Sequence, residues 1–340
     1  MSKALVSKRK PPVNLDSQDL HLFQHEFEKP FLEPELATIN DVCVNFQGIL
    51  FKGLKILMIS FRDSKNSKYE QYIHQLKFIV KNHILNKQIK VEKGIWFTDT
   101  WTLGYFHWFA DGLTRLESLP ENFTGTLYLP LAYSNYQYVT ESLKYYSRFD
   151  VQFIPDKHSV EFGELLIPRP TSVTTGNYND GILRSLRNRL TQKGASDNKN
   201  RNERIYISRA KANRRRVINE SDLFPILEQY GFEVVHLEDW TWHEQVELFS
   251  RCKYLVSIHG AGLTNMVLMP NGQQVLELRR AEDKHNNCYF SMASALKIDY
   301  WYLNGDRIDE GTGDDSIIVS EGHLAETLKG MLENRVNNAT

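Results

Sequence analysis

A glycine-rich turn near residue 260 carries residue types that suit phosphate binding. An apolar run that begins at Tyr254 ends in His259, which is followed by Gly260, Ala261, Gly262, Leu263, Thr264 and Asn265. This order predicts a buried strand, a tight turn and the start of a helix. The backbone N–H groups and the positive end of the helix dipole at such a turn suit phosphate oxygens, and glycine lets a phosphate approach the backbone. We therefore expect an anionic ligand there, with a plain structural turn as the alternative.

Three arginines upstream of this turn favour the same conclusion. Arg209 follows an expected strand over residues 204–208, and Arg215 and Arg216 belong to a short basic run. Arginine binds phosphate oxygens in a bidentate manner. The turn and the arginines together indicate a small, highly charged ligand such as a nucleotide diphosphate. The alternative for the basic run is a solvated face.

The turn also resembles the dinucleotide-binding fingerprint G-x-G-x-x-G, with Asn265 in place of the third glycine. Glu277 ends the next expected strand, where an acid that binds ribose hydroxyls lies in such proteins. An NAD(P)-dependent Rossmann oxidoreductase is therefore an alternative, although it leaves the arginines unexplained. For Glu277 itself, the alternative is a surface acid at a strand edge.

A second pattern joins an imidazole and a carboxylate. His107 and Asp111 are four residues apart in an expected helix over residues 103–116, so both side chains project from one face. Burying such groups among aromatic residues is costly unless they are paired or functional. We expect Asp111 to act as a general base that His107 orients, or the reverse, with Tyr105 and Trp108 stacking on sugar rings. A surface ion pair beside an aromatic core is the alternative.

Composition narrows the class of protein. The chain has 340 residues, of which 41% are hydrophobic and 24% are charged, so we expect two globular domains of ordinary size. Because the net charge is −1, we expect no general attraction to nucleic acid. The sequence contains no run of about 18 apolar residues, so no transmembrane helix is expected. Three scattered cysteines, no H-E-x-x-H and no Asp-x-Asp indicate a reducing compartment and no metal cofactor. We expect a cytoplasmic protein, with docking at the inner face of the membrane left open.

Expected strands and helices alternate along the chain, which is typical of parallel α/β sheets. In the first half the expected strands cover 42–51, 55–60, 94–98, 126–130 and 151–155, and the helices 69–87, 103–116 and 136–146. In the second half the strands cover 204–208, 233–237, 254–259, 274–278 and 300–303, and the helices 181–192, 221–230, 242–250, 262–269, 289–296 and 323–334.

Polar and proline-rich stretches divide this pattern. We expect an N-terminal arm (residues 1–38), a first α/β domain (39–167), a linker (168–179), a second α/β domain (180–322), and a closing helix with a tail (323–340). The prediction is therefore two α/β domains that face each other across a cleft.

Six segments, in this order, resemble glycosyltransferase family 61. They are Gly104-Tyr-Phe-His107-Trp-Phe-Ala-Asp111, Ile207-Ser-Arg209, Arg215-Arg216-Val-Ile-Asn219-Glu220, Glu244-Gln245-Val, His259-Gly-Ala-Gly-Leu-Thr-Asn265 and Val275-Leu-Glu277-Leu. The combination is specific, whereas each segment alone is not. The family includes bacterial capsular-polysaccharide enzymes and eukaryotic N-acetylglucosaminyl- and xylosyltransferases.

The resemblance implies a GT-B architecture, two Rossmann-like domains with parallel sheets, and inversion at the anomeric carbon. It places the acceptor and the catalytic base in the N-terminal domain (39–167) and the nucleotide sugar in the C-terminal domain (180–322). It implies a nucleotide-diphosphate sugar, which we expect to be UDP-linked, and a glycan acceptor of a bacterial cell envelope or capsule. Asp111 would take the proton of the acceptor hydroxyl. His259, the glycine turn and the three arginines would stabilise the leaving diphosphate without a metal ion. A nucleotide-sugar-binding module without catalytic activity is the further alternative.

Overall fold

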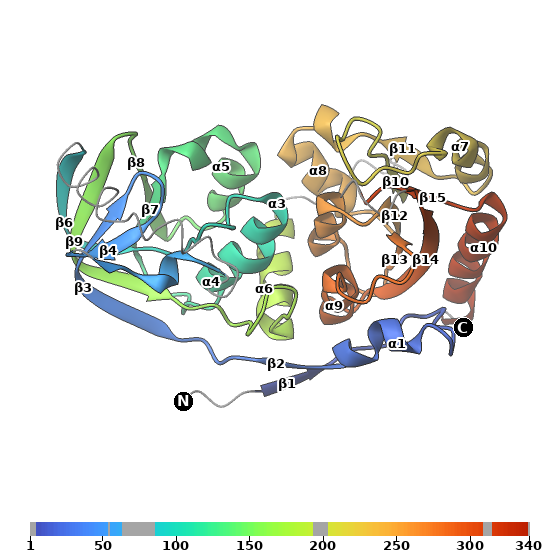
Figure 1. The fold of residues 1–340 in the computed structure, drawn as a ribbon, viewed down its shortest axis with the longest axis horizontal. Coiled ribbons are helices and arrows are strands. Elements are labelled where there is room, and N and C mark those ends of the chain that lie inside the picture. Colours follow the sequence, from blue (N-terminus) through green and yellow to red (C-terminus); the bar gives the residue numbers. More distant parts are fainter. Residues whose placement is uncertain (1–4, 54, 63–85, 193–202, 309–314, 339–340) are drawn as a thin grey trace. The chain divides into compact units, whose positions relative to one another are not determined.

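The chain folds into two compact units (Figure 1). The computed structural model describes residues 5–53, 55–62, 86–192, 203–308 and 315–338. The first unit is built on residues 32–171, and the second combines residues 3–31 with residues 172–340. The helix expected over residues 69–87 lies outside the described residues, except for its last two positions.

The second unit contains a six-stranded sheet in the order β11-β10-β12-β13-β14-β15. Its strands are β10 (Arg204–Ile207), β11 (Glu233–Val235), β12 (Tyr254–Ile258), β13 (Gln274–Arg280), β14 (Asp299–Arg307) and β15 (Ile317–Ile318). All neighbouring pairs are parallel except β14 and β15. Because β11 lies on one side of β10 and the later strands on the other, the strand order reverses between β10 and β12. Doubly wound sheets bind ligands at such a reversal, beyond the carboxyl ends of the strands.

Helices cover both faces of this sheet. One face carries α7 (Glu220–Gln229) and α10 (Glu321–Asn338), which contact each other, and the other carries α6 (Asp180–Thr191), α8 (Trp242–Phe249), the 3-10 helix η7 (Ala261–Leu268) and α9 (Cys288–Ala295). Every residue of β12 is buried, as expected for a parallel strand covered on both faces. Alternate side chains of β12 and β13 enter the core with α7 and α10, so Ser257 and Glu277 face the other layer.

The first unit contains a seven-stranded mixed sheet in the order β5-β4-β3-β9-β6-β7-β8. Its strands are β3 (Leu36–Asn45), β4 (Leu50–Lys52), β5 (Lys55–Ile56), β6 (Lys87–Ile95), β7 (Gly125–Pro130), β8 (Phe149–Ile154) and β9 (His158–Pro168). The pairs from β9 to β8 are parallel, but β3, β4 and β5 pair antiparallel, as does β3 with β9. The expected wholly parallel sheet is therefore wrong for this unit, because short turns join β3 to β4 and β4 to β5 and reverse the chain.

The helices that the structure describes in the first unit are short. They are η2 (Met58–Ser60), α3 (Tyr105–His107), the π-helix η4 (Trp108–Leu113), α4 (Thr114–Glu117), η5 (Leu131–Asn135) and α5 (Gln137–Leu143). The second unit also contains the 3-10 turn η6 (Leu237–Asp239). No helix among the residues that the structure describes is both long and apolar enough to span a membrane.

The N-terminal segment is part of the second unit and not a peripheral arm. It forms the antiparallel pair β1 (Leu5–Lys8) and β2 (Glu28–Phe31), with α1 (Leu20–Phe23) and η1 (Gln24–Glu26) between them. Phe23 is fully buried, and its ring lies 5.4 Å from that of Phe290 in α9. Arg9 forms an ion pair with Asp180 at the start of α6. The expected arm over residues 1–38 is therefore wrong for residues 5–31. Its buried side chains are few and include the polar Ser7 and Arg9, so the segment has no apolar periodicity that could have been recognised.

The boundary between the units is sharper than the expected linker over residues 168–179. The chain passes from one unit to the other at residues 31–32 and 171–172. Asn177 and Tyr178 are buried, so this part of the expected linker is packed structure of the second unit.

Burial of Phe23 leads to a prediction on stability. Replacement by alanine should lower the free energy of unfolding by about 3–5 kcal/mol, because it leaves a cavity among aromatic rings. Leu20 of the same helix is 40% exposed, and its alanine variant should change stability by no more than about 0.5 kcal/mol. Chemical denaturation of both variants measures this; equal small effects would contradict the packing of the N-terminal segment.

Candidate functional site

The strand reversal of the second unit brings two predicted site residues to neighbouring positions. Ile207 and Ser257 pair in register near the ends of β10 and β12. Arg209 lies two residues beyond the first strand and His259 follows the second. Both side chains therefore start from the carboxyl edge of the sheet, at the place where doubly wound sheets bind ligands.

The first glycine of the turn makes room for Arg209. A Cβ atom on Gly260 would lie 3.1 Å from Nη1 and 3.2 Å from Cζ of this arginine. The φ angle of Gly260 is 168°, which any residue adopts, so the close contact with Arg209 and not the backbone conformation favours glycine here. Gly262 allows a different contact, because a Cβ there would lie 3.3 Å from the side chain of Ile207. The two glycines thus let a guanidinium group lie on the turn and let η7 pack against β10.

Arg209 also organises the loop that carries the other arginines. Its Nε donates to the carbonyl of Arg215 at 3.1 Å, and Nη2 donates to that of Arg214 at 3.3 Å. Within the described part of the chain, no carboxylate lies within ion-pair distance of this guanidinium. Burial lowers its pKa from the ordinary value, which is consistent with a cation held without a counter-ion. An anion is the ligand that such a group favours.

A small pocket beside the turn contains a second group of charges. His259, Arg215, Arg280 and Asp315 are among the residues that line it. Asp315 Oδ1 lies 2.7 Å from Arg280 Nη1, and its Oδ2 lies 3.6 Å from Arg215 Nε and 3.3 Å from Arg214 Nη2. Three arginines therefore surround one carboxylate. Arg280 was not predicted from the sequence, although its place at the end of β13 puts it at the same edge.

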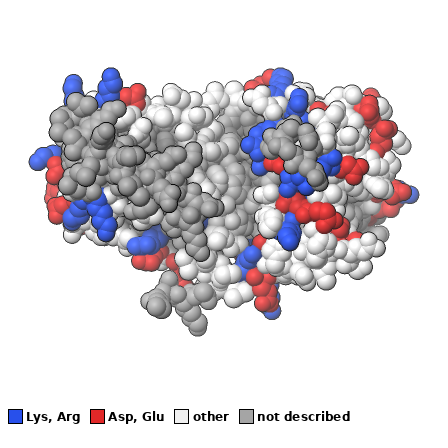
Figure 2. All heavy atoms as spheres, viewed as in Figure 1, with Lys and Arg blue, Asp and Glu red and all other residues white. Residues whose placement is uncertain are grey.

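Neighbouring Arg216 faces elsewhere. Its side chain lines a separate depression with Glu220 and Phe224, at the start of α7. Arg215 and Arg216, which the sequence could not distinguish, therefore belong to different surfaces. Figure 2 shows Lys and Arg side chains gathered on the face of the second unit over β10, β12 and β15.

Glu277 does not lie where the sequence placed it. It is in the middle of β13, is fully buried, and has both oxygens bonded. One oxygen pairs with His259 Nδ1, and Oε2 accepts from the hydroxyl of Tyr300 at 2.6 Å. A contact with ribose hydroxyls needs an exposed carboxylate, so this geometry does not fit the expected role. Sequence gives the residue type at this position but not its burial.

The turn after Gly262 is also different from the expected one. Residues 261–268 form a 3-10 helix, and the side chains of Leu263, Thr264 and Asn265 are buried. Asn265 lies within 3.4 Å of Gln245 in α8. These three side chains therefore pack inside the unit and do not face a ligand. Only Ala261 and Gly262 of the turn are accessible, and the first N–H groups of a helix have no partner within it.

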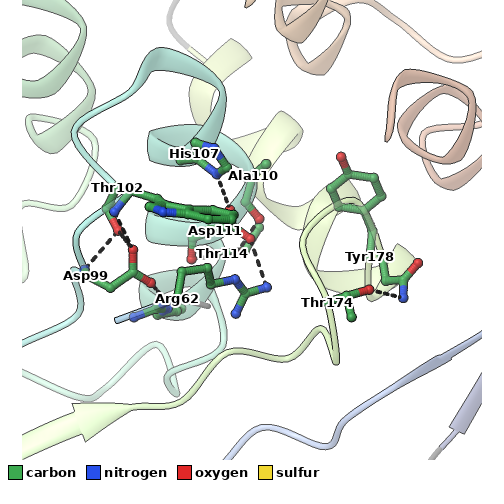
Figure 3. Close-up of polar contacts among 12 residues, drawn as sticks. Arg62, Asp99, Thr102, His107, Ala110, Asp111, Thr114, Thr174 and Tyr178 are labelled. Atoms are coloured by element: carbon green, nitrogen blue, oxygen red, sulfur yellow. Dashed lines mark hydrogen bonds and ion pairs between the residues drawn. The ribbon is translucent and has the colours of Figure 1, made fainter. Parts of the chain in front are cut away.

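The His107–Asp111 pair exists in the first unit. His107 Nδ1 lies 2.7 Å from Asp111 Oδ2, and Arg62 Nη2 lies 3.2 Å from Oδ1 (Figure 3). The carboxylate is almost fully buried, with 3% of its side chain exposed, whereas the histidine side chain is 25% exposed. Since Nδ1 is bonded to Asp111, Nε2 is the nitrogen that remains for a substrate.

The helix that carries the pair is irregular. It begins as α3 after Gly104, becomes the π-helix η4 and ends as α4, where one regular helix was expected. A single turn of π-helix is frequent at functional sites. Asp99 holds the preceding loop in place. Its carboxylate accepts a hydrogen bond from the hydroxyl of Thr102 and forms an ion pair with the guanidinium of Arg115. The Asp99–Arg115 ion pair therefore ties the loop that follows β6 to the helix that carries the His107–Asp111 pair.

One expected sugar-stacking residue is part of the core. Trp108 is fully buried, and its Nε1 donates to Ser142 Oγ at 2.9 Å. It therefore cannot stack on a sugar. Tyr105 is partly exposed and packs on Phe109 with ring centres 4.9 Å apart. Trp101, which the prediction omitted, is 40% exposed, and its ring centre lies 5.1 Å from that of His107.

Metal ligands do not gather in the parts of the chain that the structure describes. There, no three His, Cys, Asp or Glu side chains are close enough together to hold an ion. Independence from metal ions remains a prediction.

These two sites lie on the segments that a known family shares. The sequence model of Glycosyltransferase 61 matches residues 105–276, just over half of the 340-residue chain. The chain therefore belongs to glycosyltransferase family 61, as the resemblance of its motifs implied. The matched segment runs from the start of α3 into β13, so it includes the His107–Asp111 pair, the arginine loop and the glycine turn.

Particular relatives carry the names of N-acetylglucosaminyltransferases. The chain is 26% identical to mouse EGF domain-specific O-linked N-acetylglucosamine transferase over 227 residues, in an alignment that covers 58% of this chain and 42% of the mouse protein. It is 29% identical to the Drosophila melanogaster protein of that name over 136 residues, in an alignment that covers 38% of this chain and 26% of the fly protein. It is also 29% identical to mouse Protein O-linked-mannose beta-1,4-N-acetylglucosaminyltransferase 2 over 142 residues, in an alignment that covers 40% of this chain and 24% of that protein. The chain thus spans less than half of each relative.

The two tryptophans beside His107 should differ in what they do for the fold. Trp108→Ala should lower the free energy of unfolding by about 3–5 kcal/mol because it empties a core position. Trp101→Ala should change it by no more than about 1 kcal/mol because the ring is already partly in solvent. Urea denaturation of both variants checks this, and a large loss at Trp101 with none at Trp108 would reverse the assignment.

Proposed function

We propose that this protein is an inverting, GT-B type glycosyltransferase that transfers a sugar from a nucleotide-diphosphate donor to a hydroxyl of a glycan. The observation that supports this most directly is the guanidinium of Arg209 lying on Gly260 at the strand reversal, beside His259 and Arg215. It offers fixed positive charge, free of a carboxylate partner within the described residues, next to the accessible start of η7. Membership of family 61 gives the reaction class.

The diphosphate is the part of the donor that these groups fit. When the bond between the sugar and the diphosphate breaks, the diphosphate gains negative charge. Positive groups already in place stabilise that charge more in the transition state than in the bound donor, and this lowers the barrier. We assign Arg209 and Arg215 to this role, with the backbone of Ala261 and Gly262. No step of the proposal needs a metal ion.

The His107–Asp111 pair is our candidate for the proton acceptor. An attacking hydroxyl must lose its proton as the new bond forms at the anomeric carbon. The sequence favoured Asp111 as the direct base, with exchange of roles left open. Burial favours the exchange: Asp111 is enclosed by His107 and Arg62, whereas His107 is the more exposed member. In this arrangement His107 Nε2 receives the proton, and Asp111 fixes the tautomer and stabilises the imidazolium, as carboxylates do in other His–Asp pairs.

The names of the relatives indicate the first donor to test. Because they transfer N-acetylglucosamine by name, UDP-N-acetylglucosamine is the first choice, and a glycan of the cell envelope or capsule remains our proposed acceptor. Action in the cytoplasm or at the inner membrane face is likewise a proposal. A sugar-binding module without catalysis would bind the donor but never release free nucleotide. An oxidoreductase would bind NAD(P) in its place.

Donor binding gives the first test of this function. UDP should raise the melting temperature, uridine should not, and EDTA should leave the shift unchanged, because a ligand of the folded state stabilises by mass action. Arg215→Ala should weaken UDP binding by roughly 10- to 150-fold, the loss of one charge-assisted bond.

Arg216→Ala is the matched control for this experiment, since it removes the same charge from the adjacent position. It should bind UDP with nearly wild-type affinity. Equal losses in both variants would show that only the general charge of the run matters. A shift with NAD(P) and none with UDP would contradict the assignment of the turn.

Variants of the His–Asp pair test the proton acceptor. His107→Ala should lower turnover by about 10²–10⁴-fold, as expected for loss of a general base, and Asp111→Asn should lower it by a similar or smaller factor. The double variant should be little worse than His107→Ala, because groups that act as a unit are not additive. UDP affinity should not change in any of them. Normal turnover of folded His107→Ala, with an inactive Asp111→Asn, would make Asp111 the direct base.

A further inference from the structure

The most heavily buried acid of the second unit faces the candidate phosphate site through a histidine. Glu277 is fully buried in β13, near the middle of the sheet. A carboxylate in such a place is strongly destabilising unless it is hydrogen-bonded or paired. Within the core, an apolar residue would fit the strand as well as a charged one does. Packing alone therefore does not explain why an acidic residue occupies this position.

Two donors from the neighbouring strands meet the carboxylate. His259, directly after β12, presents Nδ1 to one oxygen, and Tyr300 in β14 donates its hydroxyl to the other. Burial, and next the charge of Glu277, raise the pKa of Tyr300 well above its ordinary value, so the phenol stays protonated and remains a donor. Since an ionised carboxylate only accepts, Nδ1 must carry a proton. The arrangement thus fixes one side of the imidazole.

Because Nδ1 is bonded to Glu277, Nε2 is the ring nitrogen that remains for the pocket. His259 lines it together with Arg215 and Arg280. The ring is held from a further direction by Tyr289, whose ring centre lies 5.0 Å away. If a phosphate oxygen lies at Nε2, both ring nitrogens face an anion. The doubly protonated ring is the form that donates to both of them.

The resemblance to family 61 assigns His259 to the leaving diphosphate, and from this geometry we propose that Glu277 and Tyr300 are its positioning residues, which hold the imidazole so that Nε2 donates to the terminal phosphate of the leaving nucleotide. The inference rests on the proposed function. The bond from the anomeric carbon to the phosphate oxygen breaks, and its electron pair stays on that oxygen, which the Nε2–H group stabilises. The acceptor oxygen forms the new bond, and its proton goes to the His107–Asp111 pair.

A comparison of UDP with UMP tests this, because only UDP has the terminal phosphate. By calorimetry, His259→Ala should weaken UDP binding by roughly 10- to 150-fold, the loss of one charge-assisted bond, and leave UMP binding unchanged. Glu277→Gln keeps the volume but cannot accept from both donors, so it should show the same selective loss. In a ¹H–¹⁵N spectrum of the imidazoles, it should also change the Nδ1 signal of His259.

Tyr300→Phe keeps the carboxylate and removes one donor, so it serves if Glu277→Gln fails to fold. It should lower UDP affinity by a smaller factor than His259→Ala, again without an effect on UMP. Equal losses for both nucleotides in His259→Ala, or a wild-type UDP-to-UMP ratio in both Glu277→Gln and Tyr300→Phe, would overturn the inference. A wild-type protein without preference for UDP over UMP would contradict the proposed function itself, and the inference with it.

Discussion

The buried carboxylate of Glu277 is the constraint on which the second unit depends. A charge in the centre of a parallel sheet needs partners from both neighbouring strands, and His259 and Tyr300 supply them. Arg279 forms the next layer: its Nη1 lies 3.4 Å from the hydroxyl of Tyr300, and its guanidinium lies 4.7 Å from the ring centre of Phe23. The N-terminal segment therefore contacts the same network through Phe23.

The candidate phosphate site beside this network is built from the shape of the backbone at Gly260 and from the charges of Arg209 and Arg215. Gly260 leaves space for the guanidinium of Arg209, which in turn holds the carbonyls of the arginine loop. Arg215 then reaches the pocket of His259, with its residue in the left-handed region at a φ of 58°. Each element depends on the previous one, so the site is largely formed before a ligand binds. Preorganised charge of this kind is what electrostatic stabilisation of a leaving group requires.

The sequence predicted the second unit well and the first less well, for physical reasons. The apolar runs over 204–208, 254–259 and 274–278 lie within two residues of the observed strands, because strands buried on both faces are continuously apolar. β9 was missed because no helix separates it from β8. β1 and β2 were missed because paired strands at a surface lack such runs.

Among the site residues, sequence gave types and spacing but not exposure. It identified His107 with Asp111, and the arginines with the glycine turn. It could not tell that Trp108 and Glu277 are buried, because aromatic and acidic residues occur both in cores and at sites. It omitted Trp101, which precedes the expected helix over residues 103–116 and packs on His107, and Arg280, whose partner Asp315 lies 35 residues further along the chain.

The central claim is that a nucleotide diphosphate binds at the strand reversal of the second unit. Hydrogen–deuterium exchange with and without UDP tests it most directly, because exchange reports local protection of backbone amides. We expect slower exchange in peptides that cover residues 208–216 and 259–265, and no change in peptides that cover residues 105–117. Protection confined to other segments, or none at a UDP concentration that stabilises the protein, would contradict it.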